Sequence, residues 1–216
     1  MREEERLALN GKSLVLEEAY FPELGNIKVL NMPLMQSIVV FGLPGVKRND
    51  PDYYSAYVMN YILGGGGFIS RLTREIREKR GLVYSVYSYL SPLQHTGLLI
   101  GGFATRNDAV FKTLDILKYE ISLMASEGVS EAELLAAKQY LTGAFPLRLD
   151  TGSKIARILT QMQIDDLGID YLQKRNAFID AVTVEDVNAV AKRLLNSERL
   201  QVIVVGEPVR IDQGGS

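Results

Sequence analysis

The sequence of 216 residues contains no cysteine and a single histidine, and both shortages narrow the chemistry open to it. Without cysteine the chain can form no disulfide, offer no thiol nucleophile and bind no metal through thiolates. A zinc site built on histidine normally needs two or more imidazoles, or one imidazole with several carboxylates. His95 lies in "SPLQHTG", between a proline and a glycine, which indicates a turn. We therefore expect no metal site in this chain.

Long apolar runs and an excess of one charge are also lacking. No run approaches the roughly 18 apolar residues that a membrane-spanning helix needs, and "MREEERLALNGKS" at the start has no apolar core of a signal peptide. The net charge of −2 gives no basic surface for nucleic acid. We expect neither a membrane nor a nucleic-acid partner. The absence of cysteine suits the cytosol and the periplasm equally, so the compartment stays open.

What is present is ordinary for a soluble globular protein with a sizeable core: 47% hydrophobic and 23% charged residues. Residues 1–25 are polar and indicate a linker or leading arm. No linker interrupts the following residues, so 26–208 are expected to form a single domain, and 209–216 a tail.

The order of the expected elements determines the fold class. Alternating or β-branched runs predict five strands, at 27–32, 37–43, 82–90, 96–105 and 200–206. Helical spacing predicts helices at 51–63, at 68–79 and over most of 107–196. This order excludes a doubly wound sheet. It predicts an α+β fold of two layers, with a largely antiparallel sheet and helices packed on one face.

The segment "GGGGFISRLTREIREKRGLVYSVYSYL", residues 64–90, could be a phosphate-binding loop or part of an active site. No lysine follows the glycines, as a P-loop requires, and a helix precedes them where a dinucleotide-binding motif has a strand. We therefore expect a tight turn between two helices, with at least one residue at positive φ. The glycines of this turn are Gly64, Gly65, Gly66 and Gly67.

The charged helix after the glycines has two interpretations. Ile69, Leu72 and Ile76 form its apolar stripe, and three i,i+4 pairs predict a solvated face: Arg71–Glu75, Arg74–Glu78 and Glu75–Lys79. Arg77 has no acid four residues away on either side. Tyr84 begins the next strand, across a turn at Gly81. The two side chains could project to one side, where they could hold a peptide carbonyl and donate to a developing oxyanion.

A family resemblance bears on this choice. "LGGGGFISRLTREIREKRGLVYSVYS" resembles the signature of the second, zinc-free domain of pitrilysin/insulinase-type metallopeptidases (inverzincins), which include the mitochondrial processing peptidases. "QSIVVFGLPGVKRNDPDYYSAYVMNYIL", "EGVSEAELLAAKQYLTGAF" and "LQVIVVG" extend the resemblance over most of the chain. The catalytic domain of that family carries the zinc motif H-x-x-E-H. With one histidine, this chain has no such motif.

The resemblance implies the non-catalytic, substrate-binding half of a zinc endopeptidase, which completes a clamshell active site opposite a zinc-bearing domain or subunit. Arg77 and Tyr84 would hold the substrate backbone and assist the oxyanion, and the loop 64–67 would lie near the substrate. The implied partners are the zinc-bearing domain and a peptide; the isolated chain could also form a homodimer. The alternative is a scaffolding homologue without a role in proteolysis, like the core subunits of respiratory complexes. The presence of both Arg77 and Tyr84 favours the peptidase.

Overall fold

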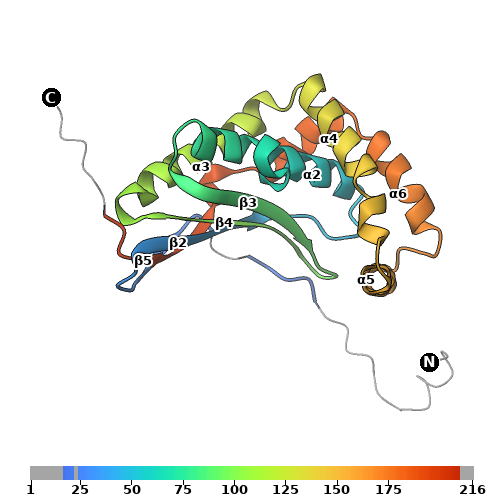
Figure 1. Cartoon of the computed structure of the whole chain (residues 1–216), viewed down its shortest axis with the longest axis horizontal. Coiled ribbons are helices and arrows are strands. Elements are labelled where there is room, and N and C mark those ends of the chain that lie inside the picture. The colour runs from blue at the N-terminus through green and yellow to red at the C-terminus, as the bar shows by residue number, and fades with distance from the viewer. Residues whose placement is uncertain (1–16, 22–23, 210–216) are drawn as a thin grey trace, which may run out of the picture.

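The computed structural model describes residues 17–21 and 24–209, which form a sheet with helices stacked on one face (Figure 1). The predicted arm 1–25 and tail 209–216 lie mostly outside the described residues. None of the helices in the described part has both the length and the apolar character needed to cross a membrane.

The sheet has five strands in the order β1-β5-β2-β4-β3. Their bounds are β1 Ile27–Asn31, β2 Gln36–Pro44, β3 Val83–Pro92, β4 Gly97–Arg106 and β5 Gln201–Gly206. Every neighbouring pair is antiparallel except β1 and β5, which run parallel. The predicted α+β fold with a largely antiparallel sheet is therefore confirmed.

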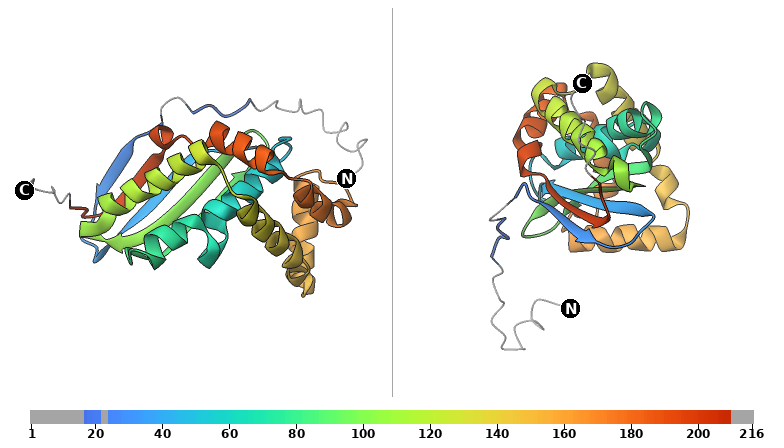
Figure 2. Two further views of the ribbon diagram at one scale, coloured as in Figure 1. Left: turned by 90° about the horizontal axis from the view of Figure 1, so that it is seen from above. Right: turned by 90° about the vertical axis from the view of Figure 1, so that its left-hand side faces the viewer.

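Most of the helices lie over one face of this sheet, whereas the helix Gly152–Ile164 lies beyond one end of it (Figure 1 and Figure 2). Their bounds are α2 Tyr53–Asn60, α3 Val110–Glu127, α4 Glu131–Gly143, α5 Gly152–Ile164, α6 Tyr171–Asp180 and α7 Val184–Leu194. Strand β2 shows the consequence, because buried and exposed residues alternate along it. Val39 and Phe41 are buried under the helices, whereas Ile38 and Val40 on the other face are about half exposed.

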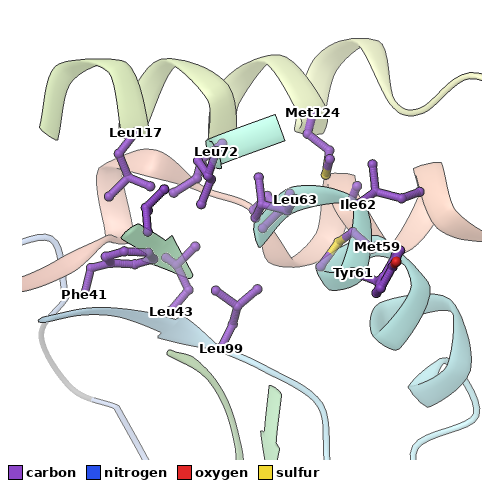
Figure 3. Close-up of a cluster of buried hydrophobic side chains, with 14 of the residues drawn as sticks. Phe41, Leu43, Met59, Tyr61, Ile62, Leu63, Leu72, Leu99, Leu117 and Met124 are labelled. Carbon is purple, nitrogen blue, oxygen red and sulfur yellow. The ribbon is translucent and has the colours of Figure 1, made fainter. Parts of the chain in front are cut away.

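The core lies between the two layers. Large apolar side chains from sheet and helices meet there with at most 1% of their surface exposed, and each contributes about 1.5–3 kcal/mol by leaving water. Figure 3 shows this cluster, which includes Phe41, Leu43 and Leu99 from the sheet and Leu63, Leu72 and Leu117 from the helices.

Two predicted details near the glycine run are wrong. The helix expected from residue 68 begins after Ser70, whose backbone is extended, because Gly67–Ile69 forms a short 3₁₀ turn of its own. Ile69 therefore does not join the apolar stripe and is 59% exposed, whereas Leu72 and Ile76 are fully buried. Gly64 and Gly65 also belong to the preceding helix, in a π-helical turn over Tyr61–Gly65.

Other local predictions are confirmed. Gly67 and Gly81 adopt positive φ values of +59° and +60°. His95 lies in the connection between β3 and β4. The S-x-x-E spacing of Ser130 and Glu133 is typical of a capping box, and the two residues form one at the start of α4.

Candidate functional site

The charged segment after the glycine run is a helix of which one side is buried. Residues 71–78 continue from Ser70, and the part Thr73–Glu78 has π-helical geometry. Leu72 and Ile76 hold it in the core with no exposed surface. The predicted apolar stripe is therefore confirmed at Leu72 and Ile76, and the helix packs against β3 and α3.

Arg71 fixes the helix to the start of α4. Its Nε and Nη2 donate to the two carboxylate oxygens of Glu133 at 2.7 and 2.8 Å, and Nη2 also donates to the Gly128 carbonyl at 2.9 Å. Burial alone would raise the pKa of Glu133, but the hydrogen bonds from Arg71 and Ser130 outweigh it and lower the pKa to about 2. The pair is therefore charged at neutral pH, and it replaces the predicted Arg71–Glu75 pair.

Glu75 forms ion pairs with the basic side chains at the end of the helix. It accepts from Lys79 at 2.7 Å, the one predicted i,i+4 pair that is found, and from Arg80 at 2.9 Å. Arg74 contacts Glu75 at 3.4 Å in place of its predicted partner Glu78. A π-helical turn brings residues five apart together, which explains the contact with Arg80. Burial would raise the pKa of Glu75, but these hydrogen bonds lower it to about 2.

The structure brings Arg77 and Tyr84 together. The Arg77 guanidinium carbon lies 5.5 Å from the centroid of the Tyr84 ring. The turn between them is closed by two backbone hydrogen bonds, from the Gly81 N–H to the Arg77 carbonyl at 2.9 Å and from the Leu82 N–H to the Ile76 carbonyl at 3.1 Å. The pairing therefore follows from the end of the helix itself.

The polar groups of Arg77 and Tyr84 have few partners among the described residues. Within the described residues, neither the Arg77 guanidinium nor the Tyr84 hydroxyl makes a hydrogen bond, and Tyr84 is 87% exposed. Arg77 has one ion pair there, with the adjacent Glu78 at 3.4 Å, which the i,i+4 pattern did not predict. Tyr84 and Gln36 are among the residues that line a depression of about 880 Å³, whereas Arg77 is not.

Phe68 is a third member of this site, and the sequence analysis missed it. Its ring centroid lies 4.6 Å from the Arg77 guanidinium carbon, and the side chain is 72% exposed. Arg77 thus makes cation–π contacts with two exposed aromatic rings. The sequence feature that could have identified Phe68 is its position as a large aromatic residue directly after four glycines. We define Phe68, Arg77 and Tyr84 as the aromatic–arginine cluster.

The glycine run passes close to β3 next to this cluster. A Cβ atom on Gly64 would lie 2.9 Å from the Ser88 backbone nitrogen and 3.0 Å from a Leu72 methyl carbon. Ser88 and Asn60 hold the contact with reciprocal hydrogen bonds, at 2.7 Å between their side chains and 3.2 Å from the Asn60 amide to the Ser88 carbonyl. Position 64 therefore requires glycine, because the neighbouring atoms leave no room for a Cβ atom.

We expect Gly64→Ala to destabilise the chain by about 1–3 kcal/mol, because backbone atoms of β3 must shift to admit the methyl group. Gly143→Ala is the matched control. Gly143 also ends a helix, but its Cβ would meet nothing within 4 Å, so alanine there should raise stability by about 0.5–1 kcal/mol. Urea unfolding of both variants measures the contrast. Equal effects would contradict the packing argument.

No metal site accompanies the cluster. In the described ranges, no group of three or more histidine, aspartate or glutamate side chains is arranged to hold a metal ion. The side chains of the cluster offer hydrogen bonding and cation–π contact.

Comparison with known proteins defines the class. Residues 15–141 match the model of the peptidase M16 inactive domain, and the chain belongs to that family. The crystal structure of a peptidase M16 inactive domain from Pseudomonas fluorescens is similar, with a TM-score of 0.83 and 31% identity over 94% of this chain and 48% of that one.

Curated relatives are about twice as long or longer. An uncharacterized zinc protease of Streptomyces coelicolor is 36% identical over 84% of this chain and 39% of its own length. A non-peptidase homolog of Helicobacter pylori is 32% identical over 82% of this chain and 41% of its own length. The chain thus spans about two fifths of the relatives that it matches.

Proposed function

We propose that this chain is the substrate-binding half of a two-part zinc peptidase, with the zinc held by a homologous half that carries H-x-x-E-H. Its membership of the M16 inactive domain family supports this, as does its match to less than half of relatives named as zinc proteases. The observation that carries the proposal is the aromatic–arginine cluster, in which the half-buried Arg77 guanidinium and the exposed Tyr84 hydroxyl have few partners among the described residues.

The cluster has the chemistry to bind a peptide backbone. Arg77 offers several N–H donors in a fixed plane to substrate carbonyls, and the rings of Phe68 and Tyr84 restrict its position. The Tyr84 hydroxyl can donate to the oxyanion that develops as a peptide bond is attacked. Zinc in the other half supplies the activated water and polarises the scissile carbonyl. The glycine loop 64–67 borders the bound peptide in this arrangement.

Alone, the chain should bind no stoichiometric zinc and cleave no peptide, because it has one imidazole and no thiolate. Cleavage should appear when the chain is combined with the homologous H-x-x-E-H half, and should be lost on chelation. Metal analysis and a fluorogenic peptide assay of each half and of the mixture measure this. One tightly held zinc per chain, with activity of the chain alone that chelation abolishes, would overturn the proposal.

A scaffolding role is the second candidate function. It is supported by the relative that is named as a non-peptidase homolog. A scaffold needs the surface of the domain but not the free donors of Arg77 and Tyr84. Substitutions in the cluster that leave cleavage by the combined halves unchanged would therefore support the scaffold.

A further inference from the structure

A second group of arginines and aromatic rings lies at the opposite end of the helical layer, around a cavity of about 250 Å³ between α2 and the α5–α6 segment. In Figure 1, α5 and α6 lie together at the right-hand end of the molecule. The loop before α2 contributes Arg48, the segment after α4 contributes Arg148, and α6 contributes Arg175. The cluster at Phe68 has no residue in this cavity, so the two sites are separate.

Arg48 occupies an aromatic cage within this cavity. Its guanidinium carbon lies 4.0 Å from the ring centroid of Tyr53, 5.4 Å from that of Tyr171 and 5.6 Å from that of Tyr54. Three rings around one cation are the arrangement that binds a quaternary ammonium ligand, but here a side chain of the protein fills it. A cationic ligand is therefore excluded, and the cavity is suited to an anion.

The charges around the cavity are not balanced. Its lining holds three guanidinium groups and one carboxylate, that of Asp165. The Arg48–Asp165 distance is 3.9 Å, well beyond the 2.7–2.9 Å of a charge-assisted hydrogen bond. The other hydrogen bond of the Arg48 side chain to a described residue, to the Tyr54 hydroxyl, is also long at 3.5 Å. Most donors of Arg48 thus lack a close acceptor in the described chain.

Arg175 adds a buried positive charge without a counter-ion. It is 5% exposed, stacks on Phe145 at 4.1 Å and donates to the Leu141 carbonyl at 3.1 Å and the Asn176 side chain at 3.0 Å. No carboxylate of the described residues forms an ion pair with it. Arginine is rarely buried unless it is paired with an acid.

The other residues that line the cavity, and its volume, indicate the size and polarity of the ligand. Ile158, Met162 and Leu167 supply apolar lining, together with the ring of Phe145. Tyr53 also lines the cavity, and its hydroxyl can donate to an anion; burial raises its pKa to about 12, further above neutral pH than the ordinary value. The volume lies just below the range of about 300–1,000 Å³ for ligand pockets, which limits the ligand to a small molecule or one residue of a larger one.

We propose that this cavity binds a small organic carboxylate with an apolar or aromatic body. The carboxylate interacts with Arg48 and Arg148, and the body packs against the apolar walls. A free aryl or alkyl acid and the C-terminal residue of a peptide share this chemistry.

Calorimetric titration of the chain with 3-phenylpropanoate and 4-methylpentanoate tests the proposal. We expect dissociation constants of about 0.1–1 mM, the range for ligands of this size. The neutral 3-phenylpropanamide should bind at least about tenfold more weakly, because it cannot pair with the arginines. Inorganic phosphate should not compete, because it lacks the apolar body. A peptide ending in phenylalanine, compared with its C-terminal amide, distinguishes a peptide terminus from a free acid.

Arg148→Gln should weaken binding of the acid about tenfold, since it removes one exposed guanidinium from the lining. Arg157→Gln is the matched control, because Arg157 is exposed on α5 and does not line the cavity. Amide binding equal to acid binding, equal effects of the two variants, or no binding of either acid at 10 mM, about tenfold above the expected range, would each overturn the proposal. If Arg148→Gln lowers the melting temperature, the acid–amide comparison on the unaltered chain still decides.

Discussion

Replacing Tyr84 by phenylalanine is expected to lower kcat of the combined halves by about 10²–10³-fold, the loss that accompanies removal of one oxyanion donor. The melting temperature of the chain should hardly change. The side chain is 87% exposed and its hydroxyl makes no hydrogen bond within the described residues, so phenylalanine loses no contact that stabilises the fold. Cleavage kinetics and thermal unfolding on the same preparation measure both effects.

Tyr119→Phe is the matched control for this substitution. Tyr119 lies on α3, is 62% exposed and is not part of the aromatic–arginine cluster, so the same change there should leave kcat unaltered. An unchanged kcat for Tyr84→Phe would exclude a role for the hydroxyl in catalysis. A fall in melting temperature that accounts for the lost activity would reduce Tyr84 to a structural residue.

Arg77→Ala should act differently from Tyr84→Phe. If Arg77 holds the peptide equally in the ground state and the transition state, its loss raises KM with little change in kcat. Its ion pair with Glu78 and its cation–π contacts with Phe68 and Tyr84 are each worth at most about 1 kcal/mol at partly exposed sites, so the cost in stability should be about 1–2 kcal/mol. Arg157→Ala, which removes an exposed arginine on α5 that lies outside the aromatic–arginine cluster, is the control. An effect on kcat alone would contradict this role for Arg77.

The largest expected effect on stability comes from Arg71. Arg71→Met should lower the free energy of unfolding by about 3 kcal/mol, because it leaves the Glu133 carboxylate and the Gly128 carbonyl without their buried donors. For a chain of this size, that corresponds to a fall of about 6–12 °C in melting temperature. Differential scanning calorimetry measures it.

Two further variants isolate the cause. Arg74→Met removes a cation that is half exposed and 3.4 Å from Glu75, so it should cost less than about 1 kcal/mol. The double variant Arg71→Met/Glu133→Leu removes both charges of the buried pair and should regain part of the stability, although it also loses a capping side chain. An Arg71→Met variant as stable as Arg74→Met would show that the pair contributes little.

The sequence by itself determined the features that depend on neighbouring residues. Alternating or β-branched runs predicted strands β1 to β5, because side chains of a strand point to opposite faces in turn and branched side chains favour extended backbone. Ser130 and Glu133, three positions apart, have the spacing of a capping box, and Gly81 has the residue type that favours a left-handed turn. The closeness of Arg77 and Tyr84 also depends on residues near in sequence, because one turn joins the helix to the strand.

Only the tertiary structure decided which distant residues meet. Arg71 pairs with Glu133, 62 residues away, because the helix that carries it packs against the start of α4. Phe68 joins Arg77 because a 3₁₀ turn, rather than a continuous helix, follows the glycines. The cage around Arg48 combines α2 and α6, which no local spacing relates. The periodicity of apolar residues indicates which side of one helix or strand is buried, whereas these contacts depend on how separate elements pack.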